Sequence, residues 1–315
     1  MYWLAQAPAN IALIKYMGKK ETHSNLPDNS SLSYTLNNLL STVRLELSST
    51  SSDYWQPLPI PGTREFLLAE AGQKRFIAHL ERLKKIFAYP GHFFIQSNNN
   101  FPHGSGLASS ASSFAALTRC AAQALSELTH KELPSVEQQA HWSRLGSGSS
   151  CRSFYSPWAL WNEEQVSAID LPYKDLIHQV LVISAQEKAV SSSEAHQRVK
   201  TSSAYIERSH RAELRLNSLL QAFTQKNWAM IFQLCWDEFQ DMHQLFSTCE
   251  HSFSYMTAES VAALNIIQDL WHRAGDGPLV TMDAGPNIHL LYREDQVELA
   301  QQFTTDYLLG QYHVL

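Results

Sequence analysis

The first half of the chain alternates apolar and polar positions in short runs. STVRLELSS (41–49) is one example within the first fifty residues, and such alternation predicts β-strands. FFIQSNNN (93–100) predicts a further strand that ends in an asparagine-rich turn. We expect a helix of small residues over about 108–128. Another helix should start at Ser135, where Gln138 is placed to complete a capping box, and end near LGSGSS.

The second half has a different pattern. VLVIS (180–184) is a continuous apolar run, typical of a fully buried strand. The pattern is helical for most of 202–246, and a further helix is expected over 258–273, with Leu264, Ile267 and Trp271 on one face. PLVTM and NIHLLY then predict two strands joined by the tight turn DAGPN.

This order of strands, helices and strands predicts an α+β protein. We place a domain boundary near residue 180, which gives an N-terminal domain of residues 1–180 and a C-terminal domain of residues 181–315. The length of 315 residues also makes two domains the natural division.

Composition narrows the classes of protein that fit. Hydrophobic residues make up 44% and charged residues 17%, and no apolar run approaches the length of a membrane helix. The opening MYWLAQAP has neither a basic region nor a long apolar region, so we expect no signal peptide. Four cysteines lie far apart without a CxxC pair, which argues against a disulfide framework and a zinc site. We therefore expect a cytoplasmic protein without membrane partners.

The net charge of the chain limits the kinds of ligand that it can bind. A value of −6 argues against a general nucleic-acid binder, because such proteins need a basic excess to replace phosphate counterions. An anionic ligand would have to be met by a local group of lysine and arginine residues.

The segment HGSGLASSASS (103–113) is a candidate phosphate loop. It leads into the helix expected from about residue 108, and a helix N-terminus offers unpaired backbone N–H groups and partial positive charge. Gly104 and Gly106 would let the backbone approach a ligand, while Ser109 and Ser110 would add hydroxyl groups or a magnesium ligand. The loop matches neither GxxxxGK[ST] nor GxGxxG. Taken alone, a flexible loop before a packing helix explains it equally well.

Two further segments carry positive charge. APANIALIKYMGKK (7–20) groups Lys15, Lys19 and Lys20, which could bind a phosphate ester or form a solvated strand end. GSGSSCRS (146–153) ends in Arg152, whose guanidinium suits bidentate contact with a carboxylate or phosphate. An ordinary helix end followed by a loop would produce the same segment.

The last two candidate segments lie in the second half. MDAGPN (282–287) sets Asp283 at the end of a strand, where it could serve as a general base or merely form the turn. EKAVSSSEAHQRV (187–199) places Lys188 and three serines after a buried strand, as a helix cap or as ligand contacts.

Taken in order, these segments resemble the GHMP kinase superfamily and, most closely, its diphosphomevalonate decarboxylase family. The chain's APANIALIKYMGK is similar to APxNIAxIKYWGK, LPDNSSLSYTL to LPxNSSLSxTL, and GLASSAS to the family's phosphate loop. GSGSSCRS resembles RGSGSACRS, KAVSS resembles KxVSS, and MDAGPN contains DAGPN. The match spans nearly the whole chain.

The resemblance implies a fold and a reaction. The fold would be that of the GHMP kinases, with an N-terminal domain like domain 2 of ribosomal protein S5, a C-terminal α/β sandwich domain and a cleft between them. The reaction would be the ATP-dependent decarboxylation of mevalonate 5-diphosphate to isopentenyl diphosphate, in the mevalonate pathway of isoprenoid biosynthesis. ATP and Mg²⁺ would be the cofactors, and the protein would be a homodimer.

The resemblance also implies residue roles. Asp283 would take or orient the proton of the C3 hydroxyl, and Arg152 with Asn10 would fix the substrate carboxylate. Substrate binding would further involve Tyr16, Lys19, Ser147, Ser149 and Ser192. The nucleotide phosphates would be bound by Ser97, Gly104, Gly106, Leu107, Ala108, Ser109 and Ser110, with Ser109 and Ser110 also contacting Mg²⁺.

The chain departs from the family pattern at several positions. Met17 stands where tryptophan is usual, which should alter packing beside the lysine. Asp28 replaces a neutral residue and adds negative charge near anion-binding segments. His103 and Ser105 replace small residues in the outer part of the phosphate loop.

Three alternatives stay open at this stage: a phosphomevalonate decarboxylase, a mevalonate-type kinase, and a ligand sensor without turnover. Asp283 and Arg152 together favour decarboxylation over a kinase that stops at the 3-phosphate. The set of Tyr16, Lys19 and Ser147 with Ser149 favours the diphosphate over the monophosphate. A sensor would be expected to lose the base or the phosphate loop, and the sequence retains both.

Overall fold

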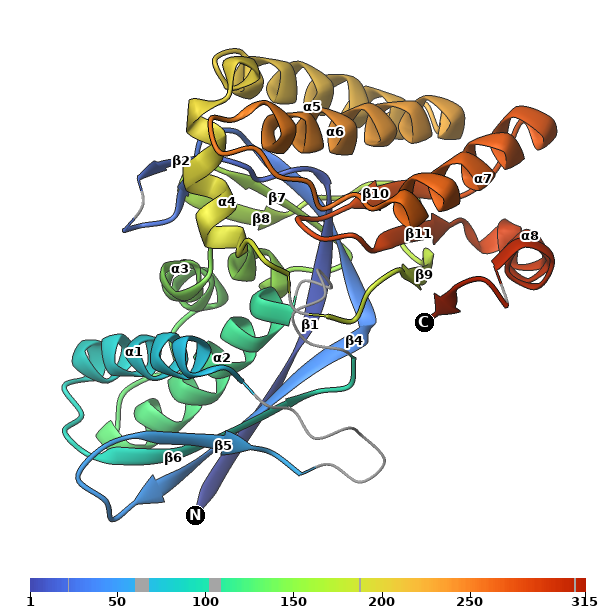
Figure 1. Cartoon of the computed structure of the whole chain (residues 1–315). Coiled ribbons are helices and arrows are strands. Elements are labelled where there is room, and N and C mark those ends of the chain that lie inside the picture. Colours follow the sequence, from blue (N-terminus) through green and yellow to red (C-terminus); the bar gives the residue numbers. More distant parts are fainter. Residues whose placement is uncertain (22, 60–67, 102–108, 187, 309) are drawn as a thin grey trace.

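The N-terminal part of the chain folds around a mixed β-sheet (Figure 1). The computed structural model describes residues 1–315 except 22, 60–67, 102–108, 187 and 309. The strands lie in the order β5-β6-β4-β7-β8, and β1 also pairs with β4. Only the β5–β6 pair among these is parallel. The strands are β1 (Tyr2–Ile14), β4 (Ser31–Ser48), β5 (Tyr54–Pro57), β6 (His92–Asn99), β7 (Trp158–Asn162) and β8 (Gln165–Ala168).

Helices cover this sheet on one face (Figure 1). Helix α2 contacts β1 and β4, and α1 and α3 pack beside it. A 3-10 helix, η1, follows α3 directly and contacts both α2 and β1. A short ribbon of β2 (Lys19–Glu21) and β3 (Leu26–Pro27) lies apart from the sheet. The helices are α1 (Glu70–Phe87), α2 (Ser109–Thr129), α3 (Val136–Gly146) and η1 (Gly148–Phe154).

The C-terminal part forms an antiparallel sheet of its own, with strand order β10-β11-β9-β12. Helix α6 packs on β10, on α5 and on β1 of the first sheet. The strands are β9 (Ile177–Val182), β10 (Leu279–Met282), β11 (Ile288–Tyr292) and β12 (His313–Val314). The helices are α4 (Ser192–Arg198), η2 (Val199–Thr201), η3 (Ser203–Tyr205), α5 (Arg208–Thr224), α6 (Trp228–Thr248), α7 (Ala258–Ala274), η4 (Glu294–Gln296), α8 (Val297–Phe303) and the π-helical η5 (Thr304–Leu308).

A β-bulge in the pairing of β1 with β4 separates two stretches of β1 that pack into different cores. Before it, Trp3, Ala5 and Ala7 pack into the core formed with α1 and α2. The register with β4 shifts between Pro8 and Ala9. Pro8 pairs with Leu40 and Ala9 pairs with Leu36, so three residues of β4, 37–39, have no paired residue in β1. After the bulge, the odd-numbered residues from Ala9 onward enter the core of the C-terminal part, and Asn10 faces the side of α2 and η1.

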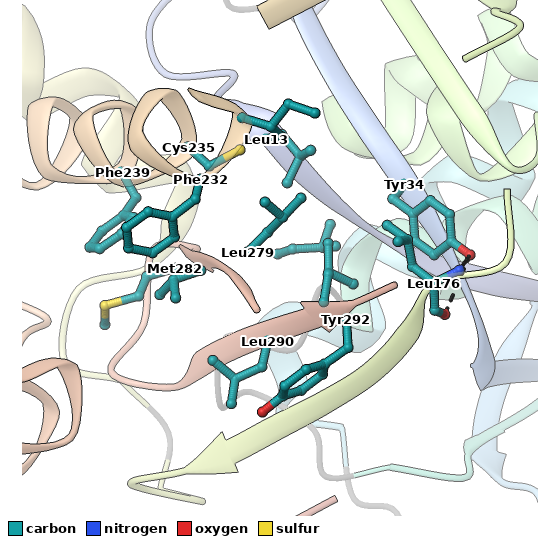
Figure 2. Close-up of a cluster of buried hydrophobic side chains, with 14 of the residues drawn as sticks. Leu13, Tyr34, Leu176, Phe232, Cys235, Phe239, Leu279, Met282, Leu290 and Tyr292 are labelled. Atoms are coloured by element: carbon teal, nitrogen blue, oxygen red, sulfur yellow. Dashed lines mark hydrogen bonds between the residues drawn. The ribbon is translucent and has the colours of Figure 1, made fainter. Parts of the chain in front are cut away.

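A large hydrophobic cluster joins the two parts of the chain (Figure 2). Leu13 of β1 and Tyr34 of β4 meet Cys235 of α6 and Leu279 of β10 in this cluster, and each of these four side chains is buried. The strand end that follows Leu13 is therefore fixed against the C-terminal helices, which matters for the site described below.

Most of the expected elements are confirmed. The helix expected over 108–128 is α2, the Ser135–Gln138 capping box is present, and α7 buries its expected face. The hairpin around DAGPN is β10–β11. Three details differ. β1 and β4 are long strands of 13 and 18 residues rather than short runs. The VLVIS strand starts earlier, at Ile177, and ends at Val182 with only part of it fully buried. The segment after α3 is a 3-10 helix and not an open loop. The boundary at residue 180 stays a prediction.

Candidate active site

The residues expected to act on ligands line one cleft of about 490 Å³. Strand β1, helix η1, the start of α2, the start of α4 and the β10–β11 turn all contribute to it. Gly104, Gly106, Leu107 and Ala108 lie outside the described residues, as do His103 and Ser105. The structure brings the others together, although they are spread over most of the sequence: Asn10, Tyr16, Lys19, Ser97, Ser109, Ser110, Ser147, Ser149, Arg152, Ser192 and Asp283.

Asp283 lies in the turn between β10 and β11, and its side chain is 28% exposed toward the cleft. The buried ammonium of Lys15 lies 2.8 Å from its Oδ1 atom. Burial acts to raise the pKa of the Asp283 carboxyl, but Lys15, His289 and Arg152 outweigh it and leave the pKa below 3.8. Asp283 is therefore ionised at neutral pH. Burial, aided by Arg152, lowers the pKa of Lys15 against the raising effect of Asp283.

Both members of this ion pair are held by buried groups of α6. The ring of His243 lies 3.2 Å from the backbone carbonyl of Asp283, and burial lowers the pKa of this histidine to about 4, so the ring is neutral and donates its Nε2 proton. Lys15 follows the end of β1, and its backbone N–H donates to Oε1 of Glu238 at 2.8 Å. Asn29 donates to the Lys15 carbonyl at 3.0 Å. The backbone N–H and carbonyl of Lys15 thus form hydrogen bonds with side chains instead of with a neighbouring strand.

Arg152 presents a buried positive charge to the cleft, with only 4% of the residue exposed. Its Nε donates to Oδ1 of Asn10 at 3.0 Å, and its Nη1 donates to Oγ of Ser31 at 2.8 Å. These acceptors are neutral, and no carboxylate among the described residues forms a salt bridge with Arg152. A buried guanidinium without a counter-charge is costly, so the geometry favours an anionic ligand at this position.

Tyr16 forms the wall opposite, with its ring between Trp161 and His196 at centroid distances of 4.6 and 4.4 Å. The backbone of η1 approaches this ring closely, because a Cβ added at Gly148 would lie 2.7 Å from it. Lys19 lies beyond Tyr16 and donates to Oδ1 of Asn25 at 2.7 Å. The residue at position 148 is therefore restricted to glycine by packing against a candidate substrate-binding side chain.

The serines of the cleft gather where α2 begins. Oγ of Ser147 lies 3.4 Å from Oγ of Ser110, which joins the η1 segment to the first turn of α2. Ser109 is the first residue of α2, so its hydroxyl lies beside the helix N-terminus. Oγ of Ser97 accepts from the Trp55 indole at 2.8 Å. The carbonyl of Ser149 accepts from Asn10 at 3.2 Å.

Three cationic residues of the cleft were not among the predicted site residues: Lys15, described above, Lys188 and Arg75. Lys188 donates to Oγ of Ser192 at 2.8 Å and to the Ala284 carbonyl at 2.6 Å, and burial lowers its pKa to about 8. The KAVSS segment contained the signal for this residue, although a ligand role was only one of two readings. Arg75 on α1 also lines the cleft, and no local motif marks it.

The departures from the family pattern have simple structural outcomes. Met17 is buried against the helices of the C-terminal part. The Asp28 carboxylate accepts a hydrogen bond from the Tyr205 hydroxyl. Lys20 is exposed and forms a salt bridge with Glu163. The three lysines therefore differ in position: Lys15 contacts Asp283, Lys19 lines the cleft, and Lys20 lies at the surface.

Family models match both parts of the chain. The diphosphomevalonate decarboxylase-like N-terminal domain matches residues 7–170, and the mevalonate 5-diphosphate decarboxylase C-terminal domain matches residues 178–313. The chain belongs to the diphosphomevalonate decarboxylase family. Membership confirms the resemblance drawn from the sequence motifs.

Relatives in this family cover nearly the whole chain. The diphosphomevalonate decarboxylase mvd1 of Aspergillus fumigatus is 33% identical over 93% of this chain and 77% of its own length. A crystal structure of a mevalonate diphosphate decarboxylase from Legionella pneumophila is 66% identical, with full coverage of both chains and a TM-score of 0.95. A structure described as MDDEF in complex with MVAPP, AMPPCP and magnesium is 27% identical over 100% of this chain and 96% of that chain, with a TM-score of 0.88.

The fold of this diphosphomevalonate decarboxylase family member is the α+β GHMP kinase fold that the motifs implied. Among the described residues, no helix combines the length and apolar character needed to cross a membrane.

Proposed function

We propose that this chain catalyses the ATP-dependent decarboxylation of mevalonate 5-diphosphate to isopentenyl diphosphate, ADP, phosphate and CO₂. The observation that carries the proposal is that one cleft contains both an ionised Asp283 and the buried guanidinium of Arg152, which forms no salt bridge with a described residue. Membership of the decarboxylase family and the relative solved with MVAPP, AMPPCP and magnesium support the same substrate and nucleotide.

Asp283 would accept the proton of the C3 hydroxyl as its oxygen attacks the γ-phosphorus of ATP and ADP leaves. A carboxylate with a lowered pKa is a weak base, but phosphoryl transfer passes through a loose transition state in which the attacking oxygen gains little bond order. Proton transfer is then needed only late in the step. The Lys15 ammonium and the His243 ring would hold the carboxylate in place for it.

Arg152 would bind the substrate carboxylate, with Asn10 fixing the guanidinium. Phosphorylation turns the C3 oxygen into a good leaving group. As the C3–O bond breaks, the electron pair of the C1–C2 bond becomes the C2–C3 double bond, and C1 leaves as CO₂. A fixed carboxylate keeps the breaking C1–C2 bond aligned with the developing positive charge at C3.

The nucleotide phosphates would lie at the N-terminus of α2. Ser109 and Ser110 supply oxygen donors there, which fit the preference of Mg²⁺ for hard oxygen ligands. Bound Mg²⁺ would supply neutralising charge for the phosphates. Lys188 would add a further cation, and Gly104, Gly106, Leu107 and Ala108 remain predictions for the same phosphates.

The cleft would also hold the substrate's diphosphate. Tyr16, Lys19, Ser147, Ser149 and Ser192 all line the same cleft, and this supports their predicted role in substrate binding. Ser97, which accepts a hydrogen bond from the Trp55 indole, would contact the nucleotide.

The deciding experiment measures ADP and CO₂ in one reaction of the purified protein with ATP, Mg²⁺ and mevalonate 5-diphosphate. The proposal expects equal amounts of the two products. ADP without CO₂ would show a kinase that stops at the 3-phosphate, and faster turnover of mevalonate 5-phosphate would show a monophosphate decarboxylase. Asp283→Asn is the matched control: it should abolish both products while AMPPCP binding is retained.

We also propose a homodimer, as the family resemblance implies, and a cytoplasmic location, which the widely separated cysteines favour. Light scattering after size-exclusion chromatography should give twice the 35.7 kDa chain mass, and a mass of one chain would contradict the dimer.

A further inference from the structure

A basic pocket of about 370 Å³ opens beside the main cleft. We call it the cation pocket, because Lys19, Arg75, Arg82 and Lys200 all line it. These residues come from β2, from α1 and from η2, so three separate segments bring positive charge to one place. Lys19 and Arg75 line the main cleft as well, which makes the two cavities neighbours.

The cations of the pocket have no counter-charge in the described part of the chain. Neither aspartate nor glutamate lines the pocket, and none of the four cations forms a salt bridge there. They donate instead to neutral oxygens: Arg75 to the Gly146 carbonyl at 3.3 Å, Arg82 to the Leu145 carbonyl at 3.2 Å, and Lys200 to the Lys19 carbonyl at 2.6 Å.

The like charges of the pocket repel one another. Burial lowers the pKa of Lys19, and Arg75 and Lys200 lower it further. Folding therefore holds these cations together against their mutual repulsion. Such an arrangement is relieved by a multiply charged anion, and phosphate oxygens accept from both the arginine fork and the lysine ammonium.

Lys200 reaches the pocket along one helical face. Ser193, Gln197 and Lys200 are spaced at i, i+4 and i+7 from the start of α4 through η2, and all three line the pocket. The first two are neutral. The only charge that this segment brings to the pocket, among its described lining residues, is therefore that of Lys200.

We infer that Lys200 and Arg82 contact the terminal phosphate of the substrate's diphosphate from the cation pocket, and that these two residues determine the preference for a diphosphate over a monophosphate ester. This inference rests on the proposed function, because Lys19 would contact the diphosphate from the main cleft. Lys200 and Arg82 line the pocket and not the cleft, so a phosphate attached directly to the mevalonate carbon chain would leave them without a partner.

The test compares wild type with Lys200→Met and Arg82→Met. A charge-assisted hydrogen bond to an exposed lysine corresponds to an affinity change of about tenfold. We expect KM for mevalonate 5-diphosphate to rise by about this factor in each variant with kcat nearly unchanged, and Lys200→Arg to restore KM. Lys20→Met is the matched control: this exposed neighbouring lysine lies outside the pocket and should leave KM unaltered.

Calorimetric titration with inorganic pyrophosphate separates this inference from the proposed function. Wild type should bind pyrophosphate about tenfold more tightly than Lys200→Met. If pyrophosphate binding depends on Lys200 but no CO₂ is released, the decarboxylase proposal fails and the anion subsite stands. Variants Lys200→Met and Arg82→Met with wild-type KM and wild-type pyrophosphate affinity would overturn the inference.

Discussion

Replacing Lys15 with methionine removes the ammonium from Asp283 while keeping a flexible side chain of similar length. Lys15 is 2% exposed and Asp283 is 28% exposed, so the lost partner is fully buried and the remaining carboxylate can reach water only through the cleft. Lys15 is the strongest of the groups that lower the pKa of Asp283. We expect the variant to be less stable than wild type. On acidification, it should also lose activity at a higher pH than wild type does.

The size of the stability loss follows from the distance between the two charges. Unit charges 2.8 Å apart attract by about 6 kcal/mol at an effective dielectric constant of about 20. The desolvation of both groups offsets much of this, and breaking a buried pair costs about 3–5 kcal/mol. Because water reaches Asp283 from the cleft, we expect the lower end, a loss of about 3 kcal/mol in the free energy of unfolding.

The sign of the pH effect is fixed by the direction of the pKa shift. The folded pKa of Asp283 lies below its ordinary value of 3.8, so the ion pair stabilises the protein above that pH and is lost as the pH falls through the folded pKa. Without Lys15 the carboxyl takes up a proton at higher pH. Since only the carboxylate accepts the substrate proton, the acid limb of the kcat profile should move to higher pH.

Denaturant unfolding and a kcat–pH profile of Lys15→Met provide the measurements, with Lys20→Met as the control for removal of a lysine. A double-mutant cycle with Asp283→Asn should give a coupling energy of at least about 1 kcal/mol. A folded Lys15→Met protein with an unmoved acid limb would refute the assigned role of Lys15.

Three other predictions concern the same cleft. Arg152→Gln should lower kcat/KM by at least about tenfold, the equivalent of about 1.5 kcal/mol for one charge-assisted hydrogen bond, and Arg152→Lys should not restore it because the fork geometry is lost; steady-state kinetics with wild-type values would contradict this. The affinity for AMPPCP should fall as the pH rises through about 8, where the Lys188 ammonium loses its proton, and Lys188→Arg should remove that fall in calorimetric titrations. Gly148→Ala should raise KM for mevalonate 5-diphosphate far more than it lowers kcat, because the added Cβ displaces the Tyr16 ring; an unchanged KM would show that the ring does not contact substrate.

The sequence was sufficient to predict the elements whose local pattern is strong. The capping box at Ser135, the buried face of α7 and the hairpin around Asp283 each rest on a few neighbouring residues. The association of Arg152 with Asp283 came from motif resemblance, since no local pattern relates two positions so far apart in the sequence.

The remaining features depend on tertiary structure. The bulge between Pro8 and Ala9, after which Asn10 contacts Arg152, depends on how β1 pairs with β4, and neither Pro8 nor the neighbouring Asn37 and Asn38 specifies that pairing. Lys15 was grouped with Lys19 because they are neighbours in sequence, whereas the end of β1 and the Glu238 carboxylate direct Lys15 to Asp283.

The cation pocket was missed for the same reason. Arg75, Arg82 and Lys200 stand in ordinary helical sequence, and isolated basic residues on a helix usually face water. Their common function becomes visible only when the folded chain brings them beside Lys19 without an acidic partner.

The orientation of substrate in the cleft is the central claim, and a crystal structure of the protein with mevalonate 5-diphosphate tests it most directly. We predict the carboxylate within hydrogen-bond distance of the Arg152 guanidinium, the C3 hydroxyl against Asp283, and the terminal phosphate in the cation pocket beside Lys200. A substrate bound in the reverse direction, with its diphosphate on Arg152, would contradict the account.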